Sequence, residues 1–167
     1  KLSKLTDAEL FWFKLPGDFE KKKSKIHITW MSSYEPWDSY KNYMVAKKFC
    51  NLKEYDESNS GTFTNFAQTD QALYDLHTYI MYLKFGFGRA TQDVGIEIRR
   101  GAMTRDQGKS LVKIYDGKFP DHNLDLYLDY YEMNKDEFFL VLEKWVNKKL
   151  FTKSKDGYGF EPNFKVE

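Results

Sequence analysis

The glycine turn at residues 86–88 constrains the fold of this chain more than any other feature, because it separates two helical patterns. The segment 70–84 has apolar residues at helical spacing, and a second helix is expected from Arg89 to Arg100. Gly86 and Gly88 can adopt backbone conformations that other residues rarely take, so they allow a tight connection. The sequence therefore predicts two consecutive helices joined by a short turn.

The residues of this turn also predict a site for phosphate or pyrophosphate. Successive backbone N–H groups around glycine can form an anion-binding concavity, and a helix N-terminus favours negative charge. Lys84 and Arg89 add full charges on either side of Gly86 and Gly88. The alternative is an ordinary interhelical turn with Gly86 as the C-cap and two solvated cations. A dinucleotide fingerprint is excluded, because the third glycine is missing and the turn follows a helix.

The first part of the chain has a pattern typical of an α/β unit. Residues 25–31 alternate and are rich in β-branched side chains, which predicts a strand. A helix is expected over 36–49, where Pro36 suits the first position. Residues 51–69 are polar and predict a long loop, a type of segment that often carries function.

The remainder of the chain is expected to be mainly helical. Capping-box patterns predict helix starts at Thr6, Thr104 and Asn134. The residues 124–133 and 134–148 form a predicted helix pair, and the tail has turn signals. The fold class is therefore α+β, mainly helical.

Composition excludes several classes of function. A net charge of +1 gives no electrostatic case for a nucleic-acid partner or a membrane partner. Cys50 is the single cysteine, which excludes an internal disulfide and a cysteine-rich zinc site, and a reducing cytoplasm fits best. No metal site is expected. His77 is predicted as a core histidine with a substrate contact as the alternative, whereas His27 and His122 are predicted to be structural or exposed.

Several ordered motifs resemble the C-terminal half of the N-acetyl sugar amidotransferases. They are Lys84-Phe-Gly-Phe-Gly-Arg-Ala-Thr91, Glu97-Ile-Arg-Arg-Gly-x-Met-Thr-Arg105, Leu111-Val-x-x-Tyr-Asp-Gly117, Pro36-Trp37-Asp38 and Gly61-Thr62-Phe63. The likeness covers roughly residues 26–150.

The resemblance implies an ATP-dependent enzyme of bacterial surface-sugar synthesis, such as lipopolysaccharide or O-antigen synthesis. Such enzymes convert the N-acetyl group of a sugar, often nucleotide-linked, to an acetamidino group. Ammonia comes from a separate glutaminase subunit, and the cofactor is ATP with Mg²⁺. The residues that the resemblance and the pattern place near nucleotide or sugar are Trp37, Asp38, Thr62, Thr64 and His77, while Lys84, Gly86, Gly88 and Arg89 are expected at the ATP phosphates.

The chain departs from this family in one important way. The ATP-pyrophosphatase loop, Ser-Gly-Gly-x-Asp-Ser, and the family's N-terminal cysteines are missing. We therefore expect only the C-terminal portion of such an enzyme, inactive by itself. Residues 1–69 would end a Rossmann-like α/β domain of the adenine nucleotide α-hydrolase type, 70–150 would be a helical region and 151–167 a tail. The alternative is a non-catalytic helical module that docks a partner through its aromatic side chains.

Overall fold

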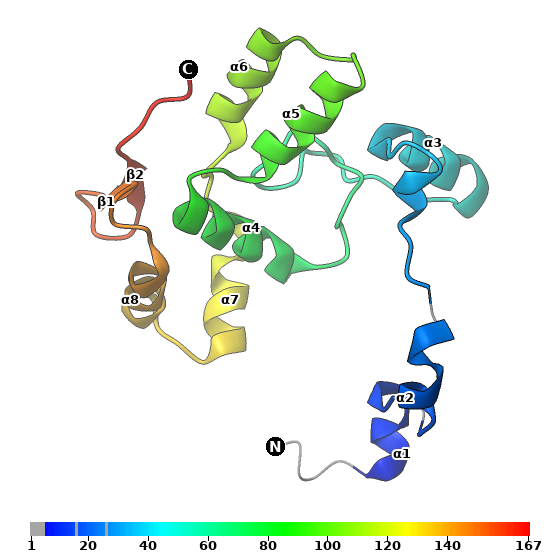
Figure 1. The fold of residues 1–167 in the computed structure, drawn as a ribbon. Coiled ribbons are helices and arrows are strands. Elements are labelled where there is room, and N and C mark those ends of the chain that lie inside the picture. Colours follow the sequence, from blue (N-terminus) through cyan, green and yellow to red (C-terminus); the bar gives the residue numbers. More distant parts are fainter. Residues whose placement is uncertain (1–5, 16, 26) are drawn as a thin grey trace. The chain divides into compact units, whose positions relative to one another are not determined.

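The computed structural model describes residues 6–15, 17–25 and 27–167 of the chain. The chain divides into two compact units, one ending at Trp37 and the other running from Asp38 to Glu167 (Figure 1). The domain boundaries predicted after residues 69 and 150 stay predictions.

The first unit consists of short helical segments. They are α1 (Asp7–Leu10), η2 (Phe11–Phe13), α2 (Phe19–Lys22), η3 (Lys23–Lys25) and η4 (Met31–Ser33). The capping box predicted at Thr6 is present, since its side chain accepts from the N–H of Glu9 and the Glu9 carboxylate accepts from Thr6 N–H in return.

The strand predicted over 25–31 is wrong for the residues that the structure describes there. Lys25 ends η3, residues 27–30 have no regular secondary structure, and Met31 begins η4. Residues 27–30 are all exposed. An alternating pattern gives a strand only where another strand can take up its backbone hydrogen bonds, and β1 and β2, the strands in the described part of the chain, pair with each other.

The second unit is mainly helical, with one small sheet. Its elements are α3 (Ser39–Cys50), α4 (Ala72–Phe85), α5 (Arg89–Arg99), α6 (Arg105–Tyr115), η5 (Asp121–Asn123), α7 (Leu124–Tyr131), α8 (Lys135–Trp145), β1 (Phe151–Lys153) and β2 (Phe160–Pro162). The helical prediction is therefore confirmed, whereas the Rossmann-like part stays a prediction.

Local side-chain caps explain where α3, α6 and α8 start. The carboxylate of Asp38 accepts the N–H of Lys41 at 2.9 Å and begins α3, three residues after the predicted start at Pro36. Full capping boxes at Thr104 and Asn134 begin α6 and α8, as predicted. The predicted loop over 51–69 is also confirmed, because these residues form no helix or strand.

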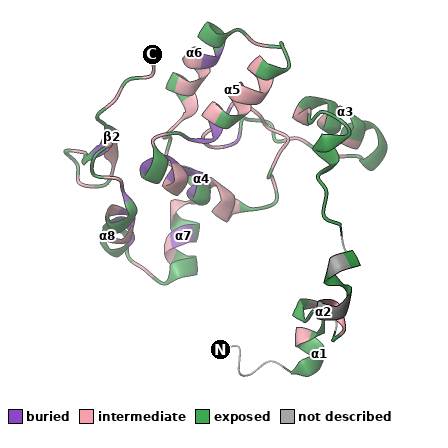
Figure 2. Cartoon of the chain, viewed as in Figure 1, coloured by how far each residue is buried: buried purple, intermediate pink, exposed green. Residues whose placement is uncertain are grey.

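The core of the second unit forms where α4, α7 and α8 meet, and purple buried segments are visible on α4 and α7 in Figure 2. Leu76, Leu83 and Tyr127 are almost completely buried there. The Tyr127 hydroxyl donates to the carbonyl of Ala72 at 2.8 Å, so the one polar atom of this buried ring is satisfied. Asn147 N–H donates to the Leu83 carbonyl at 3.0 Å and joins α8 to the end of α4.

The end of the chain folds into a two-stranded antiparallel hairpin. Phe151 pairs with Pro162 and Lys153 pairs with Phe160. The predicted turn signal at Asp156-Gly157 lies between the strands, and Gly157 has a φ of +81°. Buried Phe151 attaches this hairpin to the helical core, so the tail is part of the second unit.

Candidate functional site

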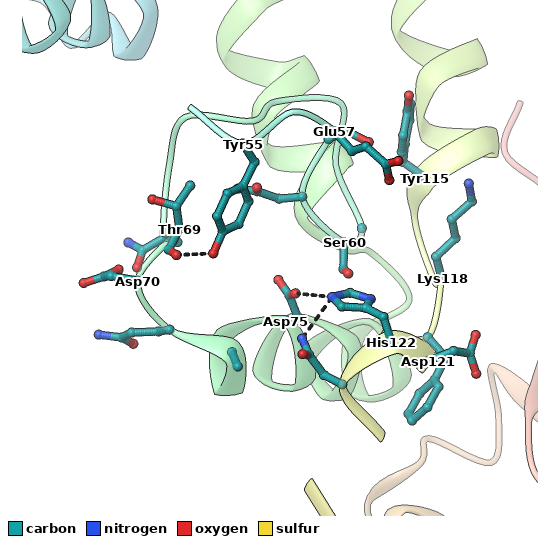
Figure 3. Close-up of a pocket in the computed structure, with 18 of the residues that line it drawn as sticks. Tyr55, Glu57, Ser60, Thr69, Asp70, Asp75, Tyr115, Lys118, Asp121 and His122 are labelled. Carbon is teal, nitrogen blue, oxygen red and sulfur yellow. Dashed lines mark hydrogen bonds and ion pairs between the residues drawn. The ribbon is translucent and has the colours of Figure 1, made fainter. Parts of the chain in front are cut away.

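A cavity of about 900 Å³ lies on the second unit and is the candidate functional site (Figure 3). Three stretches of the sequence line it: residues 55–61 of the long loop, residues 68–72 with Asp75 from the end of that loop and α4, and residues between 115 and 123 from the end of α6 to η5. This volume is in the range of small-molecule binding sites.

The long loop holds its shape through hydrogen bonds within itself. The Tyr55 hydroxyl donates to the Thr69 carbonyl, and the Tyr55 N–H donates to the carbonyl of Asn65 at 2.9 Å. The Asn59 N–H donates to the backbone carbonyl of Thr64 at 2.8 Å, and this hydrogen bond closes a turn in the cavity wall. These bonds order a segment that has no helix or strand.

The loop is attached to α5 through a buried polar cluster. Arg89 is only 6% exposed, and its Nε lies 3.5 Å from a carboxylate oxygen of Asp93. The buried Thr62 hydroxyl donates to the same oxygen at 2.6 Å. The Arg89 guanidinium also lies over the Tyr74 ring, 4.8 Å from the centroid, and contacts the carbonyl of Ala67 at 3.5 Å. Arg89 therefore connects α4, α5 and the loop.

Three atoms of this cluster have no hydrogen-bond partner among the described residues. They are Asn59 Oδ1, Thr64 Oγ1 and Arg89 Nη1, all buried. The Asn59 amide donates to the carbonyl of Ala67, the group that Arg89 also contacts, so Asn59 and Arg89 lie side by side. Buried acceptors and donors of this kind are typical positions for ordered water.

Asp75 and His122 form the ionisable pair of the cavity. His122 Nε2 lies 3.8 Å from Asp75 Oδ2 and 3.0 Å from the side-chain amide nitrogen of Asn123. The Asp75 side chain is 15% exposed and that of His122 is 65% exposed. Burial raises the pKa of Asp75, while the Ser60 hydroxyl, His122 and Arg89 act in the opposite direction. Figure 3 shows the His122 ring beside Asp75, with Ser60 above the ring.

The cavity lining combines several acidic side chains with aromatic rings. It contains the carboxylates Asp56, Glu57, Asp70, Asp75 and Asp121 against the cations Lys118 and, when protonated, His122. The rings of Tyr55 and Tyr115 lie beside them in Figure 3. Carboxylates accept hydrogen bonds from hydroxyl groups, and aromatic rings pack on C–H faces. The described residues contain no group of three His, Cys, Asp or Glu side chains placed to hold a metal ion.

The residues predicted to bind ATP phosphates make contacts within the chain itself. Gly88 N–H donates to Asp116 Oδ2 at 2.9 Å, so a carboxylate of the chain itself occupies the N-terminus of α5. Arg89 is paired with Asp93. The Lys84 ammonium lies 5.6 Å from the ring centroids of Phe85 and Trp145 and shares no described contact with Arg89. Gly86, with a φ of +78°, is the C-cap of α4. The Gly86 C-cap agrees with the alternative of an interhelical turn, whereas Arg89 is buried and not the solvated cation of that alternative. The phosphate role stays a prediction.

The predicted sugar or nucleotide contacts have separate positions. Trp37 ends the first unit and is exposed, while Asp38 caps α3 and lies 3.6 Å from Arg100. Thr62 and Thr64 belong to the buried polar cluster. Their substrate roles stay predictions.

The prediction of His77 as a core histidine is wrong, because its side chain is exposed. The buried face of α4 carries Leu76, Tyr79 and Leu83, and His77 lies about 100° further round the helix than Leu76. Its ring is 6.0 Å from that of Tyr74. The substrate contact that was the alternative stays a prediction.

Sequence reasoning missed the residues that line the cavity from other elements. His122 was expected to be structural or exposed. His122 is exposed, and it also faces Asp75 across 47 residues of sequence. The loop over 51–69 was the one signal that pointed to this site, because its length and polarity indicated function.

None of the described helices is long and apolar enough to span a membrane. None of the curated proteins matches the chain.

Residues 60–165 match the family model described as "LPS biosynthesis protein WbpG-like, C-terminal domain", where LPS is lipopolysaccharide. This match covers most of the second unit, including α4 to α8, the hairpin and two of the three stretches that line the cavity. The chain therefore belongs to the WbpG-like family of lipopolysaccharide biosynthesis proteins and carries its C-terminal domain.

Proposed function

We propose that this chain is the sugar-binding, C-terminal part of an ATP-dependent amidotransferase that acts in lipopolysaccharide biosynthesis. The intact enzyme would convert a sugar N-acetyl group to an acetamidino group, with ammonia from a glutaminase partner in the cytoplasm. Two facts support the proposal: the ordered motifs from Lys84 to Gly117, which resemble N-acetyl sugar amidotransferases, and membership of a lipopolysaccharide biosynthesis family.

The chemistry of the cavity is the observation that carries the assignment of a sugar. Five carboxylates and the amides of Asn59, Gln68, Gln71 and Asn123 line it, together with tyrosine rings. A sugar presents hydroxyl donors around its edge and C–H groups on its faces, which match this combination.

The charge of the cavity decides which part of a nucleotide-linked sugar it would take. Five carboxylates face one lysine and one histidine, so the local potential disfavours a diphosphate. We therefore assign the uncharged sugar ring to the cavity and place the nucleotide carrier outside it.

ATP and Mg²⁺ belong to the proposal for the intact enzyme, where ATP would activate the acetamido oxygen as a leaving group. We assign ATP to no residue of this chain, because Asp116 already occupies the amide groups at the start of α5. The contribution of this chain is to bind and orient the sugar and to exclude water from its acetamido group.

The test uses the full-length protein with ATP, Mg²⁺, ammonium labelled with heavy nitrogen and a panel of nucleotide-linked N-acetyl sugars. We expect the label in an acetamidino product, detected by mass spectrometry. On the 167-residue chain, an N-acetyl monosaccharide should shift the amide resonances of Ser60, Gln71 and Asn123. Unlabelled products with every sugar, together with unshifted cavity resonances at high sugar concentration, would reject the proposal.

One observation favours the second candidate, an interaction module. Helix α3 has no buried residue and exposes Tyr40, Met44 and Phe49 (Figure 2). An inactive full-length protein that still binds a protein partner through α3 would support this function over the enzyme.

A further inference from the structure

We propose that His122 is the proton acceptor of the cavity and that Asp75 is its positioning partner. This role rests on the proposed function, since it assigns a residue to the step in which nitrogen is transferred. The pair comes from two elements, α4 and the η5 segment, which fold together only in the finished structure.

The geometry of the pair fits an acid–base group. Asp75 is the more buried member, and its Oδ2 lies 3.8 Å from His122 Nε2, while the exposed imidazole reaches into the cavity. The Asn123 side-chain amide donates to Nε2 at 3.0 Å, so the neutral ring carries its proton on Nδ1 and its lone pair on Nε2, the atom that takes up a proton beside Asp75. A carboxylate behind an imidazole fixes the ring and stabilises the imidazolium that forms when the ring takes a proton.

Two observations show that Asp75 is held in place. Ser60 lies near its carboxyl group and lowers the pKa of that group, and the side chain is mostly enclosed by the cavity wall. Burial also raises the pKa of Asp75, as expected for a carboxylate with little water around it. The other charged groups that surround the pair are Asp56, Glu57, Asp70, Lys118, Asp121 and Arg89.

Amidine formation needs such a group. When the nitrogen of ammonia forms a bond to the acetamido carbon, that nitrogen becomes positively charged. One N–H bond then breaks: its electron pair stays on nitrogen, and its proton passes to the imidazole of His122. The acetamido oxygen, activated as proposed above, leaves with the electron pair of the C–O bond. His122 returns the proton to solvent through the open side of the cavity.

The first test measures amidine formation by the full-length protein with ammonium as nitrogen source. We expect His122→Ala to lower kcat by about 10²–10⁴-fold with little change in KM, as is typical of general bases. Added imidazole should restore part of this kcat. Asp75→Asn should lower kcat without rescue by imidazole, and His27→Ala, an exposed histidine of the first unit, should behave as wild type. An active His122→Ala variant, or one that imidazole leaves unchanged, would overturn the role.

The second test reads the pair without catalysis, by NMR titration of the Asp75 carboxyl in the 167-residue chain. The charge of His122 lowers the pKa of Asp75, so His122→Ala should raise that pKa further, whereas His77→Ala on the same helix should leave it unchanged. The same Asp75 pKa in wild type and His122→Ala would overturn the contact. An inactive wild-type enzyme would instead remove the proposed function, and the acceptor role with it.

Discussion

The backbone N–H of Gly88 donates a 2.9 Å hydrogen bond to Asp116, a carboxylate 28 residues further along the chain. The same carboxylate accepts from the hydroxyl and the N–H of Thr91, at 2.5 and 3.3 Å. Asp116 is the C-cap residue of α6, so this single side chain joins the end of α6 to the start of α5. The N–H groups at the start of α5, which could bind an external anion, therefore donate to a carboxylate of the chain itself.

Replacing Asp116 with alanine should therefore destabilise the chain. Hydrogen bonds to charged groups contribute about 1.5–3 kcal/mol each, and three donors lose their acceptor, so we expect a loss of at least about 2 kcal/mol. The measurement is urea unfolding followed by circular dichroism. Asp106→Ala serves as the control, because this α6 side chain is 94% exposed and should change stability by about 0.5 kcal/mol or less. Similar losses for both variants would contradict the capping role.

Replacing Gly117 with alanine should lower the free energy of unfolding, because both the backbone conformation and the space around this residue disfavour a side chain. Its φ is +78°, and an added Cβ would collide with the ring of Tyr82. Gly101 has the same φ of +78° but no neighbour within 4 Å, so Gly101→Ala isolates the cost of the backbone conformation. We expect about 1–2 kcal/mol of destabilisation for Gly101→Ala and about 2–5 kcal/mol for Gly117→Ala in thermal or urea unfolding. Equal losses would show that the Tyr82 ring moves aside freely.

The sequence predicted the helices of this fold better than its contacts. The starts of α6 and α8 are encoded within four residues, at Thr104 and Asn134, so a local pattern is sufficient. The pairing of Asp116 with Gly88, or of His122 with Asp75, depends on how separate elements pack, and no local pattern contains it. The predicted strand at 25–31 failed for the same reason, since a strand needs a partner from elsewhere.

Arg89 and Arg100 give a direct comparison of a buried and an exposed arginine. Arg89 is enclosed between Asp93, the ring of Tyr74 and the loop, whereas Arg100 pairs with Glu97 at 2.5 Å near the surface. Arg89→Ala should lower the free energy of unfolding by about 2–4 kcal/mol, because it leaves Asp93 in a partly buried site without its cation. Arg100→Ala should cost about 1 kcal/mol or less.

Urea unfolding of both arginine variants measures this difference. The cavity gives a second readout, because Arg89 supports the loop that lines it: the amide resonances of Ser60 and Gly61 should shift in Arg89→Ala and stay in place in Arg100→Ala. A well-folded Arg89→Ala variant of wild-type stability would show that the buried contacts of Arg89 contribute no net stability.

The largely buried carboxyl of Asp75 should make the free energy of unfolding depend on pH in the acid range. Burial raises the pKa of Asp75 in the folded chain above its value in the unfolded chain, so between these two values the folded state binds more protons. The free energy of unfolding contributed by Asp75 therefore falls as the pH rises from about 4 through the folded-state pKa, and is constant above it. Asp75→Asn has no such proton to lose. Its stability relative to wild type should accordingly increase with pH across this window.

The measurement is the difference in free energy of unfolding between wild type and Asp75→Asn at a series of pH values from acid to neutral. Gln71→Ala, a neutral change in the lining of the same cavity, should give a difference from wild type that does not vary with pH. A difference for Asp75→Asn that decreases with pH would mean that contacts favouring the carboxylate, from Ser60, His122 and Arg89, outweigh its burial. Asp75 would then be a stabilising ion-pair residue in the cavity wall.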